Sequence, residues 1–419
     1  MIKRSLLLGA ALLAACPASA ETLHEAVLAA QATNPTFAAA RARQDALGET
    51  VSQAAAAGRL TASADAAAGY DRLNYGKGGT GSFTVALPIW TGGRVSSAVR
   101  AARADVAAGH ENVRDSEAAL LTSVVGVYAE MLYDQQAVEI AQADITLLER
   151  QVAEAKARFK LGTSTRTDVA QLEAQRASAV ASLADAKGTL ATTSASYCAT
   201  IGHDPGALQA PTQAFLELPG TLDQARSRAI TDNPLLQASL HSADASAARI
   251  DVARANRAPS VALGGSYGYA GTVGDGRVYG APLESFASVA LHIPLLTGGL
   301  VNSQIRQASA AHRADEFDAD AQLRETLRSV DAAWAMLVGA RAQISADALR
   351  VDAADLALKG VRAEYSFGLR TTLDILVADE SLRAAQLALA RDHSAALESE
   401  AAVLRATGRL TEAEFSDSA

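Results

Sequence analysis

The sequence predicts a mixed α+β membrane protein in which two similar halves each combine long helices with a pair of strands. Three observations carry this prediction: motifs that recur at a fixed spacing, a sustained seven-residue apolar repeat, and runs of about ten residues in which apolar residues alternate with small or polar ones. The 419 residues are 49% hydrophobic but only 5% aromatic. This composition suits long, thin helices with small contact residues better than several thick globular cores.

Residues 1–20 have the pattern of an export signal. A positive region is followed by an apolar run, Leu6–Ala15, and by small residues that allow cleavage after Ala20. The run is too short to span a bilayer as a helix of the mature chain. Two other interpretations stay open. The segment could be a buried N-terminal helix, and Leu13–Cys16 also has the pattern of a lipoprotein cleavage box, which would leave Cys16 lipidated.

The rest of the chain is an internal duplication. Pro88–Gly93 recurs as Pro294–Gly299, an offset of 206 residues, and Asn34–Pro35 recurs as Asn233–Pro234, an offset of 199. General similarity between alanine-rich helices does not produce matched proline and Gly-Gly positions. The duplication divides the mature chain into a first repeat, a second repeat and a short tail: 21–212, 213–410 and 411–419.

Each repeat is expected to contain one very long helix followed by a shorter one. From Leu120 to Phe159, apolar residues fall at alternating steps of four and three, and only Asp134 breaks the register; Val330 to Tyr365 repeats the pattern. A seven-residue repeat of this length predicts coiled-coil packing, and residues 93–160 would form a proline-free rod of about 100 Å. The expected helices are 93–160 and 165–201 in the first repeat, and 299–366 and 371–407 in the second.

Alternating patterns predict a pair of strands before each Gly-Gly motif. The expected strands are about 60–71, 80–90, 259–270 and 285–296, with turns at Gly76–Gly81 and Gly271–Gly276. Four strands cannot close a barrel, and an open sheet edge is not tolerated in lipid. Because the smallest membrane barrels have about eight strands, several chains would have to share one barrel, and three chains would supply about twelve strands.

A tight reversal separates the two coiled-coil helices of each repeat. Gly162 can adopt a left-handed helix cap, and Thr165–Asp168 has the pattern of a capping box for the next helix. Gly368 and Thr371–Asp374 repeat this arrangement in the second half. Two ordinary helical hairpins would explain the glycines, but not why both tips carry an arginine followed by threonine and aspartate.

These motifs resemble the TolC-type outer-membrane efflux proteins. The resemblance covers residues 21–410 and rests on the paired Asn-Pro, the paired Pro-x-x-x-Gly-Gly and the tip motif Phe/Tyr-x-x-Gly followed by Asp. It implies a homotrimer with a 12-stranded β-barrel, four strands from each chain, that crosses the outer membrane and continues into a long periplasmic α-helical coiled-coil barrel. The implied function is export of small molecules or proteins, together with a periplasmic adaptor (membrane fusion) protein and an inner-membrane RND or ABC transporter. Lipidated members place a longer stretch before the first helix, which favours cleavage after Ala20.

The resemblance also implies roles for particular residues. In the family, a tip arginine and tyrosine of the second repeat bond to the first repeat and hold the entrance shut, and carboxylates form a ring at its narrowest point. The implied sites are an entrance gate of Thr167, Asp168, Tyr365 and Arg370; a selectivity ring of Asp374; adaptor-docking tips at Leu161, Gly162, Thr163, Phe367, Gly368 and Leu369; and strand-to-helix hinges at Pro88, Gly92, Gly93, Pro294, Gly298 and Gly299. Two positions depart from the pattern, because Val377 stands where the family has a second acidic residue, and Leu60 stands where the second repeat has Pro259.

Several classes of function are excluded by composition and spacing. A net charge of −9 does not suit nucleic-acid binding, which needs basic stripes. Seven scattered histidines and two distant cysteines give no metal-site spacing and no disulfide framework, and no catalytic motif stands out. We therefore expect no enzyme activity, no cofactor and no metal. The alternative to an export channel is a periplasmic structural coiled coil or adaptor-like rod, which periodicity alone does not exclude.

Overall fold

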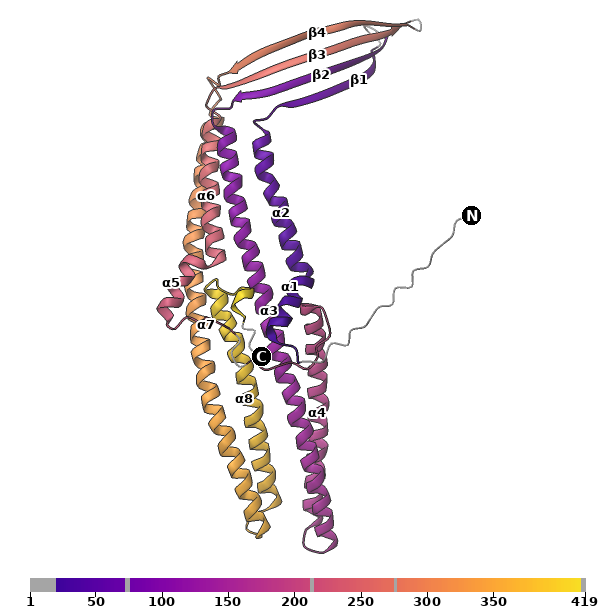
Figure 1. Cartoon of the computed structure of the whole chain (residues 1–419), viewed down its shortest axis with the longest axis vertical. Coiled ribbons are helices and arrows are strands. Elements are labelled where there is room, and N and C mark those ends of the chain that lie inside the picture. The colour runs from indigo at the N-terminus through magenta and orange to yellow at the C-terminus, as the bar shows by residue number, and fades with distance from the viewer. Residues whose placement is uncertain (1–19, 72–75, 212–214, 275–276, 416–419) are drawn as a thin grey trace, which may run out of the picture.

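The computed structural model describes residues 20–71, 76–211, 215–274 and 277–415. The expected signal segment, including Cys16, lies outside these ranges except for Ala20. Each repeat has two helices, two strands and two further helices (Figure 1). The elements of the first repeat are α1 (Leu23–Thr33), α2 (Pro35–Ala56), β1 (Thr61–Asp71), β2 (Gly76–Trp90), α3 (Arg94–Lys160) and α4 (Arg166–Ile201). Those of the second are α5 (Leu222–Asp232), α6 (Pro234–Ala255), β3 (Ser260–Gly274), β4 (Arg277–His292), α7 (Leu300–Ser366) and α8 (Thr372–Ala406), followed by the short η1 (Glu412–Glu414).

The molecule is elongated, with the sheet at one end and two helical tips at the other (Figure 1). The α3–α4 and α7–α8 hairpins form the end opposite the sheet. Helices α2, α3, α6 and α7 run between the sheet and the middle of the molecule, where α1, α5 and the C-terminal segment lie. The long helices α3 and α7 each have 67 residues, so each is about 100 Å long. Within the described ranges, no helix is both long and apolar enough to cross a lipid bilayer.

The four strands form one antiparallel sheet in the order β1-β2-β3-β4. The strands differ from the prediction at their turns. Gly76–Gly81 pairs with β1, and Gly271–Gly274 pairs with β4, so these glycines lie within strands and do not form the turns. Glycine runs are poor evidence of a turn where a neighbouring strand supplies a continuous backbone ladder.

Strand β4 also ends earlier than predicted, at His292 instead of residue 296. His292 pairs with Ser260, the first residue of β3, so the residues after His292 have no partner strand to continue the ladder. In the first repeat, β2 continues through Pro88 to Trp90, with a register irregularity between these two residues. A bulge accommodates the proline, which cannot donate to the ladder.

The main core lies in the middle of the molecule, where α1, α3, α4 and α8 meet. Its largest fully buried side chains include Leu121, Val124, Tyr128, Tyr197 and Leu404. Val124 belongs to the predicted coiled-coil register of α3, whereas Leu121 and Tyr128 are buried on α3 outside that register because other helices also cover it; Tyr197 and Leu404 lie on α4 and α8. A smaller cluster centred on Val330 and Leu337 repeats the arrangement in the second half.

The Asn-Pro motifs fix the junctions between the short helices and those that rise to the sheet. Asn34 caps α2, and its amide nitrogen donates to the Thr200 carbonyl at 3.3 Å. Asn233 caps α6 and donates in the same way to the Ala406 carbonyl at 2.9 Å. Each asparagine therefore begins one helix and satisfies a carbonyl at the end of another.

Candidate functional site

The two helical tips have the same backbone construction. Gly162 and Gly368 both have φ near +76°, the left-handed conformation that glycine adopts without a Cβ penalty. The Gly162 N–H donates to the Phe159 carbonyl at 3.0 Å, and the Gly368 N–H donates to the Tyr365 carbonyl at 2.9 Å. The predicted left-handed caps are confirmed.

The next helix at each tip begins with a capping box, also as predicted. The Thr165 N–H donates to Asp168 at 2.9 Å, and the Asp168 N–H donates to the Thr165 hydroxyl at 3.1 Å. In the second repeat, the Thr371 N–H donates to Asp374 at 2.8 Å, and the Asp374 N–H donates to the Thr371 hydroxyl at 3.3 Å. Hydrogen bonds from the threonine backbone lower the pKa of both carboxyls, so both are ionised at neutral pH.

The contacts of one chain do not join the four expected gate residues to each other. Asp168 bonds to Ser164 and Thr165, within its own tip. The Arg370 Nε donates to Glu364 at 2.7 Å, again within its own tip. Among the residues that the structure describes, the Thr167 side chain forms no hydrogen bond with another expected gate residue.

Tyr365 does link the two tips, but through a residue that sequence reasoning missed. The Arg158 guanidinium lies over the Tyr365 ring, 5.1 Å from its centroid. Arg158 belongs to α3, so this cation–π contact ties the second repeat to the first. The 206-residue offset could have drawn attention to Arg158. It makes Arg158 equivalent to Glu364, the residue that directly precedes the expected gate residue Tyr365.

Apolar side chains cover the tips. Leu161, Phe367 and Leu369 are 79%, 81% and 75% exposed. Large apolar side chains clustered at an exposed end mark an interaction surface more often than chance. Val377, at the position where a second carboxylate was missing, is 62% exposed, so no second acidic ring follows Asp374 there.

The strand-to-helix junctions at the other end also need glycine. Gly92, Gly93, Gly298 and Gly299 all have φ between 58° and 84°. A Cβ at Gly92 would lie 2.3 Å from the Cβ of Ala258, whereas one at Gly298 would have no atom within 4 Å. The first junction is therefore tightly packed and the second is open.

The sheet exposes apolar side chains in the single chain. On β4, Phe286, Val289 and Leu291 are 58–65% exposed, and Leu295 and Leu296 in the segment that follows are more exposed still. Such a surface suits lipid or another chain.

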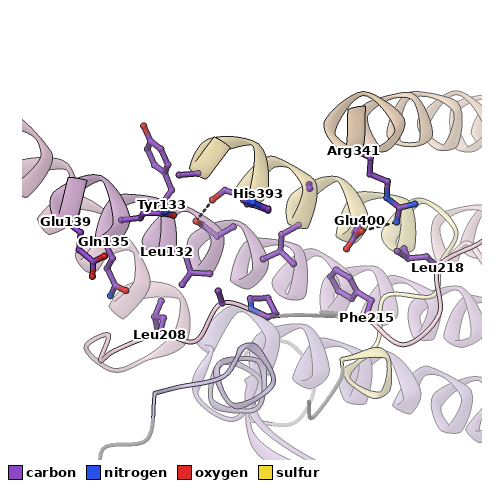
Figure 2. Close-up of a pocket in the computed structure, with 18 of the residues that line it drawn as sticks. Leu132, Tyr133, Gln135, Glu139, Leu208, Phe215, Leu218, Arg341, His393 and Glu400 are labelled. Carbon is purple, nitrogen blue, oxygen red and sulfur yellow. Dashed lines mark hydrogen bonds and ion pairs between the residues drawn. The ribbon is translucent and has the colours of Figure 1, made fainter. Parts of the chain in front are cut away.

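An open cavity of about 870 Å³ lies between α3, α8 and the linker that joins the repeats (Figure 2). Leu132, Leu208 and Phe215 supply apolar walls, and an Arg341–Glu400 ion pair of 3.0 Å lies at one end.

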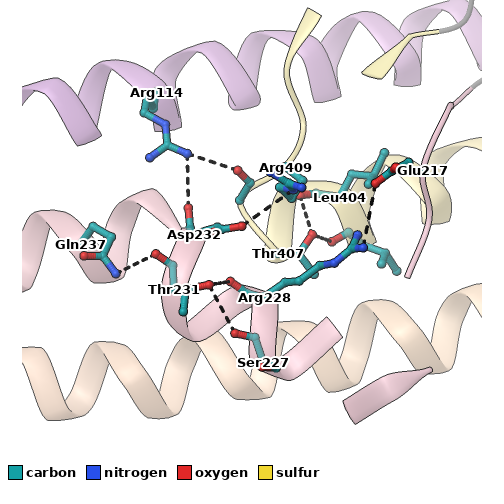
Figure 3. Close-up of polar contacts among 12 residues, drawn as sticks. Arg114, Glu217, Ser227, Arg228, Thr231, Asp232, Gln237, Leu404, Thr407 and Arg409 are labelled. Atoms are coloured by element: carbon teal, nitrogen blue, oxygen red, sulfur yellow. Dashed lines mark hydrogen bonds and ion pairs between the residues drawn. The ribbon is translucent and has the colours of Figure 1, made fainter. Parts of the chain in front are cut away.

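Arg114 on α3 donates to the carbonyls of Asp232 and Gly408, at the end of α5 and just after α8 (Figure 3). These contacts tie the middle of α3 to the second repeat. Within the described ranges, no group of three histidine, cysteine or acidic side chains could hold a metal ion.

Comparisons with known proteins agree with this geometry. The family model described as "Outer membrane efflux protein" matches residues 27–203 and 225–409. The outer membrane efflux protein BepC of Brucella suis is 30% identical over 414 residues, which cover 98% of this chain and 90% of BepC. The alkaline protease secretion protein AprF of Pseudomonas aeruginosa is 26% identical over 67% of this chain and 60% of its own length.

Solved structures show the same fold. CusC, described by its conformational changes on folding and transmembrane channel formation, superposes with a TM-score of 0.78 over 92% of each chain, at 18% identity. At that identity the likeness concerns the fold alone.

Proposed function

This chain belongs to the outer membrane efflux protein family, and we propose on that premise that it is the outer-membrane channel of an export system. It carries small molecules or proteins from the periplasm to the outside, and it has no catalytic role. It lies in the outer membrane with a large periplasmic part. The observation that supports this most is the combination, in one chain, of a four-stranded sheet with exposed apolar side chains and two 67-residue helices that lead away from it.

The working unit is a homotrimer. The sheet of one chain leaves β1 and β4 as open edges, and unpaired backbone groups are not tolerated in the hydrocarbon region of a bilayer. Joining β4 of one chain to β1 of the next removes every edge, and three chains give a barrel of about twelve strands. Outer-membrane lipid is then the partner of the exposed apolar side chains on the sheet.

The tips are the docking surface for a periplasmic adaptor, through which an inner-membrane transporter of the RND or ABC type delivers the cargo. The exposed side chains of Leu161, Phe367 and Leu369 surround Gly162 and Gly368, where a partner helix can approach the backbone closely. The relatives include both an efflux protein and a protease secretion protein, so both transporter types stay under consideration.

The entrance gate forms between chains or in a closed state of the trimer. Thr167 and Asp168 on one tip, and Tyr365 and Arg370 on another, are its expected members. In the single chain Arg370 is held by Glu364, which keeps its guanidinium charged and close to the tip. Asp374 forms the selectivity ring, since a threefold axis would bring three ionised carboxylates together.

Two measurements test the function. The mass of the purified protein in mild detergent should be three times that of the mature chain, and the protein should fractionate with outer membranes. A soluble monomeric or dimeric rod would instead support the adaptor-like alternative. Deletion of the gene should abolish export of a cargo, and a plasmid copy should restore it.

A further inference from the structure

A cluster of charged side chains joins the second-repeat hairpin to α3, apart from the tips. We call Asp144 on α3, Arg362 on α7, and Asp379 and Arg383 on α8 the Asp144 cluster. Arg383 contacts Asp144, and Arg362 lies 3.3 Å from Asp379. The Asp379 and Asp144 carboxyls belong to two different helices and lie close enough to influence each other's charge.

The cluster is largely shielded from water. The side chains of Asp144, Asp379 and Arg383 are 7%, 14% and 19% exposed. They line a cavity of about 490 Å³ between α3, α7 and α8. Charges in such a place interact more strongly than charges on an open surface.

Carboxyl groups outnumber guanidiniums around the Asp144 cluster. Arg383 is shared between Asp144 and the exposed Glu380, which lies just outside the cluster, so three carboxyls face two guanidiniums. The other charged groups that line the cavity are Glu139 on α3 and Asp355 on α7, and Asp355 is paired with Lys359 at 2.5 Å. Protonation of Asp379 reduces this excess of negative charge.

The first repeat contains an internal comparison. Lys156 and Glu173 occupy the positions equivalent to Arg362 and Asp379, and they form an ion pair of 2.6 Å. Their side chains are about half exposed, and Ala177 stands where Arg383 stands in the second repeat. The pair is thus a solvated surface contact in the first repeat, whereas in the second repeat its carboxyl is nearly buried and Arg383 beside it links α8 to α3.

Few other contacts hold the second tip against the first repeat. Leu376 packs against the clusters around Leu148 and Val152, and Tyr365 lies under Arg158. A change in the Asp144 cluster therefore acts on a hairpin end that has little else to fix it.

We propose that Asp144 and Asp379 are positioning residues of the periplasmic entrance: Asp144 binds Arg383 of α8, Asp379 takes up a proton beside it, and the arrangement in which the α7–α8 hairpin packs against α3 is thereby favoured as the pH falls from 7.5 to 5. The inference rests on the proposed function in one respect, that separation of the hairpins from α3 opens the entrance.

The sign follows from proton linkage. Burial, followed by the charge of Asp144, raises the pKa of Asp379 from 3.8 to about 6 in the packed state. If α8 moves away from α3, water reaches the carboxyl and its pKa returns toward the ordinary value. The packed state thus binds a proton that the separated state does not, and the ratio of packed to separated molecules rises about tenfold between pH 7.5 and pH 5.

Other groups on α8 with raised pKa values act elsewhere. Burial, followed by Asp347 on α7, raises the pKa of Asp392, so its proton affects contacts within the hairpin and not the contact with α3. Glu398 lies near Glu130 of α3, but its neighbours Leu397 and Ala401 belong to the main core, which stays packed. Glu398→Gln is therefore expected to leave the pH response in place.

The test measures the distance between the two tips of one chain. Spin labels at Leu161→Cys and Leu369→Cys, in a Cys198→Ser background, report this distance when labelled chains are assembled with an excess of unlabelled ones. The longer-distance population, relative to the shorter, should fall about tenfold from pH 7.5 to pH 5, and the fall should begin near pH 6. Asp379→Asn should remove the pH response, and the matched control Glu173→Gln should keep it.

Two results would overturn the proposal: distances that do not change with pH in the unsubstituted protein, or a full response in Asp379→Asn. If Asp379→Asn fails to assemble, Asp144→Asn serves instead, because loss of the like charge should move the pH response to lower pH; an unshifted response also overturns the proposal. Conductance in planar bilayers separates the two questions. If the distances change with pH but the protein conducts no current, the channel function alone is refuted. If the protein conducts current but the distances do not change with pH, the proposed role of the Asp144 cluster alone is refuted.

Discussion

The buried hydrogen bond between Asp134 and Thr193 allows the sharpest test of how the coiled coil is held together. Asp134 on α3 is the residue that breaks the apolar register, and it is only 3% exposed. Its carboxylate accepts a hydrogen bond of 2.6 Å from the hydroxyl of Thr193 on α4, which is 4% exposed. Thr193→Val keeps the shape of the side chain but removes the donor.

The expected cost follows from leaving a buried acceptor unpaired. A hydrogen bond to a charged group contributes about 1.5–3 kcal/mol, and an unpaired buried polar group costs a similar amount. We expect Thr193→Val to lower the free energy of local opening of α4 by about 2–3 kcal/mol. That corresponds to backbone amide exchange about 30- to 150-fold faster in peptides around residue 193.

The second repeat supplies the matched control. Ala340 and Ser399 occupy the positions equivalent to Asp134 and Thr193, and the Ser399 hydroxyl donates to the Ala396 carbonyl of its own helix at 2.8 Å. A buried polar pair is therefore not required for this packing. Asp134→Ala with Thr193→Val should exchange more slowly than Thr193→Val alone, because no charge is left unpaired.

Hydrogen exchange measured by mass spectrometry checks all of these variants in detergent at one protein concentration. Thr193→Ser keeps the donor and should change exchange by less than about fivefold. Peptides of α8 serve as an internal reference. The reasoning is refuted if Thr193→Val exchanges like the unsubstituted protein, or if adding Asp134→Ala makes α4 still less protected.

The remaining predictions concern the tips and the junctions. Gly162→Val and Gly368→Val should abolish export but preserve trimer assembly, since a Cβ there meets no atom within 4 Å and the φ strain costs only about 1–2 kcal/mol; export assays and detergent mass check this. Asp374→Asn keeps an acceptor for the helix cap but removes charge, so cation selectivity in planar bilayers should fall while helix content is unchanged. Because hydrogen bonding lowers the pKa of Asp374, selectivity of the unsubstituted channel should be constant from pH 8 to pH 5 and should decline only below the ordinary range of a carboxyl. Gly408→Ala should destabilise the middle of the molecule more than Gly202→Ala. A Cβ at position 408 would lie 2.1 Å from a backbone oxygen, whereas a Cβ at position 202 would meet a threonine side chain that can rotate. Thermal unfolding followed by circular dichroism compares the two variants.

Features with a local cause could be predicted from the sequence. The heptad register gives the long helices, and the glycine with its threonine–aspartate box gives each tip, because each pattern needs only neighbouring residues. The strand turns were wrong, since Gly76 lies in a strand only because β1 is beside it. The early end of β4 likewise depends on where β3 begins.

Contacts between the repeats could not be predicted in the same way. Asp144 and Arg383 are separated by 239 positions in the sequence, and nothing near either residue indicates the other. The role of Asp134 was also missed: an acidic residue in an apolar register signals a partner, but the sequence does not say that Thr193 is that partner. The duplication helps only where both repeats keep the same contact.

Differences between equivalent positions are therefore the most informative part of the duplication. Helix α3 packs against α1, α2, α4, α6 and α8, so it is surrounded along much of its length, whereas α7 packs mainly against α5, α6 and α8 among the described helices. The first-repeat pair Lys156–Glu173 is solvated, but in its second-repeat equivalent the carboxyl of Asp379 is nearly buried, and Arg383 beside it binds Asp144 of α3. A solvated pair contributes little whatever its protonation state, and a buried one changes strongly with a single proton. Because the sensitive contact lies on the less enclosed hairpin, the second repeat is the one whose position a small change in charge can alter, with α3 as the fixed support.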